Sequence, residues 1–485
     1  MNYISTRTPD AEKRSAAYVI KKGLADDGGL YVPESIPALS KAEIDSLIEM
    51  NYVDRATYIL SLFLTDYDKE ELKAAAEAAY STAKFNGPAA PIARVGDDYF
   101  LELWHGPTSA FKDMALQIMP RLLSLSLGKT GETKDAYILV ATSGDTGKAA
   151  LEGYCDVDRV RIQVFYPVNG VSNIQKKQMA SQKGNNVNVV SINGNFDDAQ
   201  SGVKAIFADE NAKSMLDEKG YFFSSANSIN WGRLAPQIVY YVSAYCDLVK
   251  EGELKYGDKL DVTVPTGNFG NILAAYIAKK MGLPLGKLVC ASNKNDILTD
   301  FINKGVYDKR REFFTTVSPS MDILISSNLE RLLWFVLGAD KTRECMEKLA
   351  KDGIYTLDDE AMEAIRADFA GISCSEDETK KTISEIFAEY GYLCDTHTAV
   401  AAKAAKEYKS ENGNKMLVVS TASPYKFAPA VLNSLGEEVP EDDFDALDKL
   451  FAVTKCAIPS NLASLREAEV RFTKTIDPKD MINSL

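Results

Sequence analysis

The feature that most constrains this chain is a repeated order of a short apolar run, a polar or glycine-containing turn, and a helix-forming segment. The apolar runs are DAYILVA (135–141), RIQVFYP (161–167), VNVVSI (187–192), LDVTVP (260–265) and KMLVVS (415–420). Their β-branched and aromatic residues predict buried strands. Their alternation with helices predicts an α/β fold with a mainly parallel sheet that is covered on both faces. Ligands of such sheets bind at the carboxyl ends of the strands, so the turns that follow these strands are candidate sites.

The length of 485 residues is enough for two or three domains with sizeable cores. We expect an N-terminal domain over 1–90, an α/β region of two lobes over 91–440, and a helical tail over 441–485. Strong helix formers predict a helix over 69–84, which NGPAAPI (86–92) ends. The region 332–408 is expected to be more helical, with SEDETKK (375–381) as a surface connection.

Composition excludes several classes of function. The formal net charge of -14 argues against a nucleic-acid-binding surface. No apolar run is long enough to span a membrane, and the first residues lack the apolar core of a signal peptide, so we expect a cytoplasmic protein. Seven scattered cysteines without a C-x-x-C spacing indicate reduced thiols, and two distant histidines argue against a zinc site. The chemistry is then expected to come from Lys, Asp, Ser, Thr or Asn side chains or from a cofactor, with no metal.

The turn TGNFGN (266–271) is a candidate anion site. It lies between a predicted strand and a predicted helix. Glycines allow a ligand to approach the backbone closely, and free N–H groups at the start of a helix favour a phosphate. The G-x-x-G spacing differs from the dinucleotide-binding G-x-G-x-x-G. A tight strand-to-helix turn without a ligand is the alternative interpretation.

The turn SGDTG (143–147), followed by Lys148, is a second candidate, although it is not a P-loop. The Walker pattern needs glycine where Thr142 stands and a hydroxyl residue where Ala149 follows the lysine, so an ATPase is not supported. The hydroxyls and helix-start amides of this loop suit a carboxylate. A purely structural turn is the alternative.

Lys112, in WHGPTSAFKDMALQ (104–117), is the candidate reactive amine. Most lysines are solvated surface groups. Here Phe111, Met114 and Ala115 are close in sequence, so partial burial is expected. Burial disfavours the charged form and makes the amine a usable nucleophile or base. An amine, a phosphate site and a carboxylate site in one α/β chain together indicate an aldehyde cofactor that carries a phosphate and acts on an amino acid.

Motifs spread over nearly the whole chain resemble those of the threonine synthases, which are fold type II (tryptophan synthase β-like) pyridoxal-phosphate enzymes. The motifs are YISTR (3–7), DGGLYVP (27–33), HGPTSAFKD (105–113), ATSGDTG (141–147), SNIQKKQM (172–179), NSINWGR (227–233), PTGNFGN (265–271) and THTAVA (396–401). HGPTSAFKD and PTGNFGN are specific to the family, whereas SGDTG alone is weaker. The resemblance implies two parallel-sheet α/β domains with the cofactor between them, preceded by a threonine-synthase-type segment at the N-terminus.

The resemblance also implies roles for individual residues. Lys112 would hold pyridoxal 5'-phosphate covalently, and Thr421 in STASPYKF would face the pyridine nitrogen of the cofactor. The cofactor phosphate would be cradled by Gly267, Asn268, Phe269, Gly270 and Asn271. Ser143, Asp145 and Thr146 would lie beside the ring hydroxyl of the cofactor and the carboxylate of the substrate.

Two of these positions need comment. Ser423 stands where the family usually has the histidine of T-x-H-P-x-K-F, so the role of Ser423 stays open. Asp145 would place a carboxylate beside a phenolate oxygen, and the two groups would repel each other unless one is protonated. Asp145 is therefore the weakest of the cofactor assignments. His105 and His397 are expected to have structural roles.

The reaction that the resemblance implies is the conversion of O-phospho-L-homoserine and water to L-threonine and phosphate, with Lys112 moving the protons. The substrate brings a second phosphate, which needs a second anion site. Its candidate residues are Asn227, Ser228, Asn230 and Arg233, with Lys176 or Lys177 as weaker candidates. Arg233 lies near a predicted helix start and offers a bidentate donor. A surface ion pair is the alternative interpretation of Arg233.

Two other functions stay open. A sister reaction on the same scaffold, such as serine or threonine dehydration or a β-replacement, would need no site for a substrate phosphate. A non-catalytic paralogue would have no use for the Lys112 amine, so the presence of that amine argues against it. For the threonine synthase interpretation, the expected partner is a small molecule, not a nucleic acid or a membrane. The protein is then expected to be a monomer or a small homo-oligomer.

Overall fold

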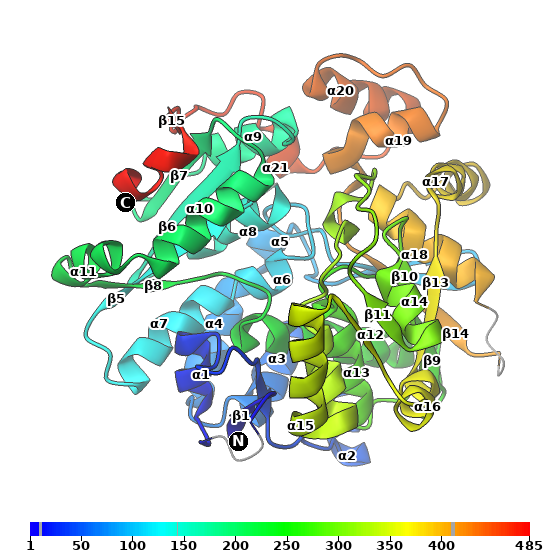
Figure 1. Ribbon diagram of the computed structural model, residues 1–485. Helices are drawn as coiled ribbons and strands as arrows, with labels where there is room; N and C mark the ends of the chain where they lie inside the picture. The colour runs from blue at the N-terminus through cyan, green and yellow to red at the C-terminus, as the bar shows by residue number, and fades with distance from the viewer. Residues whose placement is uncertain (9–11, 143, 409–412) are drawn as a thin grey trace.

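Two β-sheets form the framework of the protein in the computed structural model, which describes residues 1–8, 12–142, 144–408 and 413–485 (Figure 1). The six-stranded sheet has the spatial order β13 (Phe369–Ser373), β10 (Leu285–Ser292), β9 (Leu260–Pro265), β14 (Lys415–Ser420), β4 (Asp98–Glu102), β3 (Ile92–Val95). The five-stranded sheet has the order β15 (Thr475–Ile476), β7 (Val187–Ile192), β6 (Val160–Pro167), β5 (Asp135–Ala141), β8 (Tyr221–Ser224). Neighbouring strands of both sheets are parallel except β3 and β4. The predicted α/β fold class is confirmed, and each of the five predicted strands forms.

Helices and two small antiparallel strand pairs complete the fold. The α-helices are α1 (Ala16–Lys22), α2 (Lys41–Glu49), α3 (Tyr52–Phe63), α4 (Lys69–Ala79), α5 (Thr82–Phe85), α6 (Asp113–Leu116), α7 (Met119–Lys129), α8 (Asp145–Tyr154), α9 (Asn173–Ala180), α10 (Phe196–Ala208), α11 (Glu210–Glu218), α12 (Trp231–Lys250), α13 (Gly270–Lys280), α14 (Ile297–Lys304), α15 (Leu329–Lys351), α16 (Asp359–Asp368), α17 (Glu376–Tyr390), α18 (Thr396–Glu407), α19 (Ala428–Ser434), α20 (Asp443–Thr454) and α21 (Ser460–Ala463). The short 3-10 helices are η1 (Pro319–Met321), η2 (Pro424–Phe427), η3 (Pro478–Asp480) and η4 (Ile482–Ser484). The small strand pairs are β1 (Tyr3–Ser5) with β2 (Tyr31–Pro33) and β11 (Val306–Asp308) with β12 (Ile354–Thr356).

Alternate side chains of the six-stranded sheet enter two different apolar cores. Val289 and Val418 pack in a cluster with residues of α18. Their neighbours Leu288 and Leu417 point to the opposite face and join the main core with α12 and α13. This is the two-residue period of a strand, here with both faces buried. Burial on both faces explains why these strands are continuous apolar runs in the sequence.

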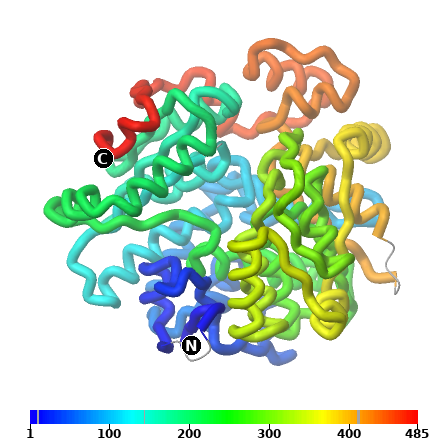
Figure 2. Tube along the Cα trace, in the orientation of Figure 1, coloured from blue at the N-terminus to red at the C-terminus, as the bar shows by residue number. Residues whose placement is uncertain are grey.

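The five-stranded sheet is covered in the same way. Leu139 and Phe165 pack with Val203 of α10, whereas Ile138 and Val164 join the main core on the other face. The C-terminal residues, red in Figure 2, lie along the outer edge of this sheet, where β15 pairs with β7. The tail expected to be helical therefore contains α20, α21, η3 and η4, but between α21 and η3 it adds the short strand β15 to a sheet.

Two helix predictions differ from the structure. The helix expected over 69–84 is divided into α4 and α5, because Tyr80 leaves the helical conformation (φ −115°) and its buried hydroxyl donates to Met114 O at 2.6 Å. The segment 375–381, expected as a surface connection, begins α17. Ser375 Oγ accepts from Glu378 N at 3.3 Å, and Glu378 Oε2 accepts from Ser375 N at 2.8 Å. The S-x-x-E spacing of this capping box is a signal for the start of a helix, which the expectation of a surface connection, based on the acidic composition, did not take into account.

The N-terminal segment is anchored to a helix that follows it by more than three hundred residues. Figures 1 and 2 show β1 beside α15. Glu330 of α15 is buried and accepts from Arg7 Nε at 2.9 Å, Arg7 Nη2 at 2.8 Å and Thr6 Oγ1 at 2.5 Å. The YISTR motif thus holds the N-terminal part of the chain on the α/β region through the contacts of Thr6 and Arg7 with α15.

Replacing Glu330 by alanine is expected to destabilise the protein by about 2 kcal/mol, because Arg7 and Thr6 would lose their shared acceptor. The measurement is the midpoint of thermal unfolding followed by circular dichroism. Glu12→Ala is the matched control, since the Glu12 ion pair with Arg14 is exposed and should leave the midpoint unchanged. Equal midpoints for Glu330→Ala and the unmodified protein would contradict the assigned anchoring role.

Candidate active site

A cavity of about 1070 Å³ lies between the two sheets, where strands of both reach their carboxyl ends. Ala141 at the end of β5, Pro265 at the end of β9 and Thr421 directly after β14 contribute to its wall. The sequence candidates that line it are Lys112, Thr146, Asn227, Ser228, Asn230, Arg233, Gly267, Asn268, Phe269, Gly270, Asn271 and Thr421. Ser143 lies outside the described residues. Of the candidates that are described, Asp145 and the two weaker candidates Lys176 and Lys177 do not line this cavity.

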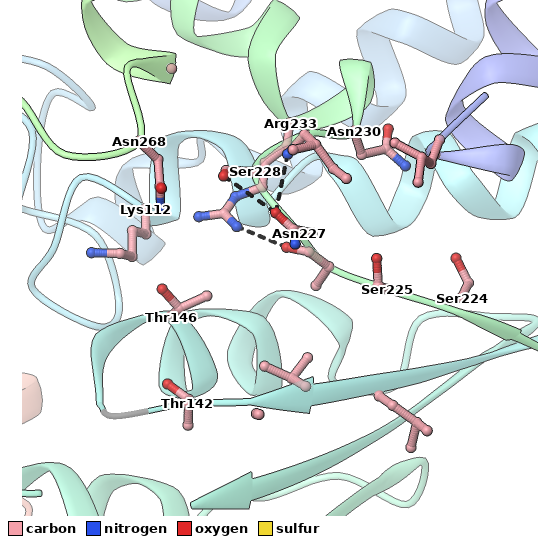
Figure 3. A pocket seen from close by; sticks show the side chains of 18 of the residues that line it. Lys112, Thr142, Thr146, Ser224, Ser225, Asn227, Ser228, Asn230, Arg233 and Asn268 are labelled. Atoms are coloured by element: carbon pink, nitrogen blue, oxygen red, sulfur yellow. Dashed lines mark hydrogen bonds between the residues drawn. The ribbon is translucent and has the colours of Figure 1, made fainter. Parts of the chain in front are cut away.

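Lys112 faces the cavity from the loop between β4 and α6 (Figure 3). This loop is held at the end of β14, since Phe111 N donates to Thr421 O at 2.8 Å. Lys112 Nζ donates to Ser320 Oγ at 3.3 Å. The side chain is half-buried because the amine faces the cavity, and burial lowers the pKa of Lys112 to about 8. A useful fraction of this amine is therefore uncharged near neutral pH.

The loop between β9 and α13 has the geometry of an anion cradle. Phe269 has a φ of 63°, in the left-handed region, and α13 begins directly after it at Gly270. A Cβ atom at Gly267 would lie 2.5 Å from Ser320 O, so glycine is required there. The first N–H groups of α13 have no partners within the helix and favour an anion.

Two tyrosines fix the side-chain amide of Asn271, in the first turn of α13. The hydroxyls of Tyr240 and Tyr241 both donate to Asn271 Oδ1, at 2.5 and 2.6 Å. Both rings are buried on α12. Because Oδ1 takes both donors, Nδ2 must face away from them, and Nδ2 is buried without a hydrogen-bond partner. An anion in the adjacent cradle would satisfy this orphaned donor.

The resemblance implies that this cradle holds the phosphate of pyridoxal phosphate. The double variant Tyr240→Phe/Tyr241→Phe is then expected to bind pyridoxal phosphate about tenfold more weakly, since nothing would orient the Asn271 amide. Binding of pyridoxal, which has no phosphate, should not change. Fluorescence titration gives both dissociation constants. Tyr245→Phe is the control on the same helix, because its hydroxyl donates to Asp258 O, away from Asn271. Equal losses for both ligands would show that the hydroxyls do not act on the phosphate.

Arg233 is a buried cation in the first turn of α12, with only 7% of its surface exposed. Its Nη1 donates to Ala226 O at 2.8 Å, and no carboxylate among the described residues forms an ion pair with it. Burial lowers the pKa of Arg233 to about 10, so the group stays charged at neutral pH. The alternative of a surface ion pair is therefore wrong. Figure 3 shows the guanidinium beside the same space as Lys112, whereas Lys176 and Lys177 do not line this cavity.

The polar residues before Arg233 differ in how their groups are used. Asn230 caps α12, since its Oδ1 accepts from Gly232 N at 2.8 Å, and its Nδ2 donates to Ile20 O at 2.8 Å. Both groups of this buried side chain are thus bound to protein. Asn227 is exposed, and Ser228 Oγ lies 3.4 Å from Asn227 Oδ1. Asn227 and Ser228 are therefore more accessible to a ligand than Asn230.

Asp145, expected beside the cofactor ring, is paired with a lysine. Lys426 Nζ lies 2.6 Å from Asp145 Oδ1, and Gln175 Nε2 donates to the same oxygen at 2.8 Å. Burial opposes ionisation, but the charges of Lys426 and Lys112 hold the pKa of the Asp145 carboxyl below its usual range. The Asp145 carboxylate is therefore paired with a cation, Lys426, which sequence reasoning did not identify.

Thr421 and Ser423 lie close together in sequence but differ in environment. Thr421 lines the cavity. Ser423 is fully buried, and its Oγ accepts from Tyr425 N at 3.3 Å at the start of η2. Ser423, which stands where the family usually has a histidine, therefore caps the start of η2.

Both histidines have protein partners. His105 Nε2 lies 2.7 Å from Glu102 Oε2. His397 is buried, with Nδ1 2.7 Å from Asp395 Oδ2, and its Nε2 accepts from Ser320 N at 3.1 Å. His397 thus positions the loop that carries Ser320. Sequence reasoning missed Ser320, because nothing in its local sequence marks a contact with a lysine two hundred residues away.

Other kinds of site find no support in the described part of the chain. No group of three His, Cys, Asp or Glu side chains among these residues could hold a metal ion. None of the described helices is long and apolar enough to cross a membrane. The cysteines are free thiols.

Three family profiles match the chain and together span most of it. They are "Threonine synthase N terminus" over residues 2–80, "Pyridoxal-phosphate dependent enzyme" over residues 92–422, and "Threonine synthase, C-terminal" over residues 398–482. The second covers the whole of the cavity wall from Lys112 to Thr421.

Individual proteins agree with these profiles. Threonine synthase-like 1 of Homo sapiens is 41% identical over 453 residues, 89% of this chain, but this chain spans only 60% of that relative's length. Threonine synthase of Pseudomonas aeruginosa is 38% identical over 477 residues, 98% of this chain and 95% of that protein. The crystal structure of pyridoxal-phosphate-bound threonine synthase from Brucella melitensis has a TM-score of 0.89 at 36% identity, and covers 100% of this chain and 98% of its own.

Proposed function

The chain belongs to the threonine synthase family of pyridoxal-phosphate-dependent enzymes, and from this premise we propose that it converts O-phospho-L-homoserine and water to L-threonine and phosphate. One observation carries the choice of substrate. The cavity that holds Lys112 is lined by two features that each suit an anion: the loop at Gly267–Asn271 and the buried Arg233. A phosphorylated cofactor needs one anion site, and a phosphorylated substrate needs the other.

The residues present fit pyridoxal phosphate, the cofactor of the family. The start of α13 and the orphaned Nδ2 of Asn271 suit its phosphate. Lys112 offers an amine with a lowered pKa to its aldehyde. Thr421 offers a neutral hydroxyl for the ring nitrogen. We propose these roles for Lys112, Thr421 and the loop over 267–271.

Bound in this cavity, the cofactor supplies an electron sink for charge that develops on the substrate carbons. The Lys112 amine takes the proton from Cα of the substrate and returns a proton at the end of the reaction. A further proton leaves Cβ as phosphate leaves Cγ, and Cγ takes up a proton to become the methyl group. Water then gives its hydroxyl to Cβ and its remaining proton to the phosphate, and Cα is reprotonated, so the atoms of substrate and water equal those of threonine and phosphate. A pKa of about 8 suits this work, because Lys112 can both accept and give a proton near neutral pH.

The remaining assignments belong to the same proposal. Arg233, with Asn227 and Ser228 beside it, would bind the substrate phosphate through charge-assisted hydrogen bonds. Thr146, and with it Ser143, would bind the substrate carboxylate at the start of α8. Asn230 is assigned to fixing the start of α12, near Arg233, and Asp145 to the pair with Lys426.

The domain division at 1–90, 91–440 and 441–485 also remains part of the proposal. It is supported by the separate profiles for the two ends of the chain. We further propose a cytoplasmic location, for which the free cysteines are the support, and a monomer or small homo-oligomer that binds no nucleic acid.

The test is a direct assay with the purified protein and pyridoxal phosphate. O-phospho-L-homoserine should give phosphate and threonine in equal amounts, the first by a colorimetric assay and the second by chromatography. Release of ammonia from serine or threonine, with no phosphate from O-phospho-L-homoserine, would establish the dehydratase alternative instead. Absence of turnover with all three amino acids would leave the non-catalytic paralogue.

A further inference from the structure

Lys426 is a fully buried cation that joins three elements next to the Lys112 loop. It lies in η2, after β14, and none of its side chain is exposed. Its Nζ lies 2.6 Å from Asp145 Oδ1 and donates to Thr108 O at 2.9 Å. Asp145 begins α8, after β5 of the five-stranded sheet, whereas Thr108 and Lys426 follow strands of the six-stranded sheet. The contact therefore ties the two lobes together beside the cavity.

The charges of two carboxylates, Asp145 and Asp113, act on the Lys112 amine, and both carboxylates are bound to other groups. Asp113, the next residue, accepts from Thr108 N at 2.8 Å and from Thr108 Oγ1 at 2.7 Å. Burial raises the pKa of Asp113 to about 7, so it is only partly ionised near neutral pH. Asp145 is bound by Lys426 and by Gln175. Lys112 itself has a hydrogen bond to Ser320 but no ion pair among the described residues.

We propose that Lys426 is a positioning residue that occupies Asp145 and so keeps this carboxylate from pairing with Lys112, which leaves the Lys112 amine free to act as a base. The importance of that amine rests on the proposed function. The assignment of Lys426 rests on contacts that the structure shows directly: its buried amine lies 2.6 Å from Asp145 Oδ1 and donates to Thr108 O.

The charges around Lys112 fix the direction of the expected effects. Burial is the largest influence and lowers the pKa of Lys112; Asp145 and Asp113 raise it, whereas Arg233 and Lys426 lower it. His397 also borders the cavity, but its Nε2 is bound to the backbone of the Ser320 loop. Loss of Lys426 would remove a repelling cation and at the same time free Asp145 for Lys112. Both changes favour the charged amine.

The experiment is competitive acetylation of the full-length chain, freed of cofactor, with acetic anhydride from pH 6 to pH 11. Peptide mapping by mass spectrometry gives the fraction of Lys112 that is modified at each pH. The midpoint for the unmodified protein is expected near 8. Lys426→Met should raise this midpoint so that labelling of Lys112 at pH 7 falls about tenfold. Asp145→Asn should lower the midpoint and increase labelling at pH 7.

Further variants separate this proposal from a merely structural role. The double variant Asp145→Asn/Lys426→Met removes both charges, so its midpoint should return toward that of the unmodified protein. Lys148→Met is the matched control, because Lys148 is also a buried lysine and pairs with Glu152 on α8. It should leave the Lys112 midpoint unchanged.

An unchanged midpoint in a folded Lys426→Met protein would overturn the proposal. If that variant does not fold, Asp145→Asn decides the question, since an unchanged or raised midpoint in it overturns the proposal equally. The labelling needs no turnover. A protein that makes no threonine therefore refutes the proposed function without affecting the result for Lys426.

Discussion

Replacing Lys112 by alanine is expected to lower threonine formation from O-phospho-L-homoserine about a thousandfold, which is in the range for loss of a positioned acid–base group. The same variant should lose the visible absorbance that pyridoxal phosphate acquires when it is joined to a protein amine. The physical reason is that Lys112 is the lysine that faces the cavity beside the anion cradle, with its pKa lowered to about 8. Phosphate release and an absorbance spectrum measure the two effects.

Two further measurements make the Lys112 experiment specific. Methylamine added to Lys112→Ala should restore part of the rate, because a free amine can enter the space that the side chain leaves. Lys204→Ala is the control, since Lys204 also borders the cavity but its amine donates to Gln200. It should keep both turnover and absorbance. Persistence of both properties in Lys112→Ala would place the cofactor link on another lysine.

Replacing Arg233 by alanine is expected to lower kcat/KM for O-phospho-L-homoserine about a hundredfold, as for the loss of one partner from a buried, charge-assisted contact. The guanidinium is buried, has no carboxylate partner among the described residues, and lies on the same cavity as Lys112. Arg233→Lys keeps the charge but not the bidentate donor, so its loss should be smaller. Initial rates over a range of substrate concentrations measure the effect.

The Arg233 result also separates the two proposed phosphate sites. The affinity of Arg233→Ala for pyridoxal phosphate should stay close to that of the unmodified protein, whereas the Tyr240→Phe/Tyr241→Phe variant should lose cofactor affinity. Inorganic phosphate should inhibit the unmodified enzyme and inhibit Arg233→Ala much less. A variant that loses cofactor affinity and keeps its KM for the substrate would reverse the two assignments.

The strands and the tight strand-to-helix turn at TGNFGN could be predicted because their signals are local. A strand buried on both faces is apolar at most of its positions, and so 135–141, 187–192, 260–265 and 415–420 were recognisable without a partner strand. The TGNFGN loop was recognisable because a close backbone approach needs glycine, and Gly267 does lie against Ser320 O.

The break between α4 and α5 shows where local signals are insufficient. Ala-rich sequence favours one helix over 69–84. The structure instead ends α4 at Ala79 and buries Tyr80. The Tyr80 hydroxyl donates to Met114 O in α6, the short helix that directly follows Lys112. Helix propensities differ by tenths of a kcal/mol per residue, so one buried ring and its hydrogen bond can outweigh them.

The sequence alone determined the α/β fold class and the strands, and it singled out Lys112 and the loop over 267–271 as candidate cofactor sites, because periodicity, glycine and short spacing act within a few residues. Only the tertiary structure decided which distant groups meet. It paired Asp145 with Lys426, set Tyr240 and Tyr241 on Asn271, and linked His397 to Ser320. These contacts join segments up to about 280 residues apart in sequence, and no local pattern encodes them. These contacts depend on how the two sheets pack. A buried charge or amide needs a hydrogen-bond or ion-pair partner, and packing decides which groups are close enough to provide one.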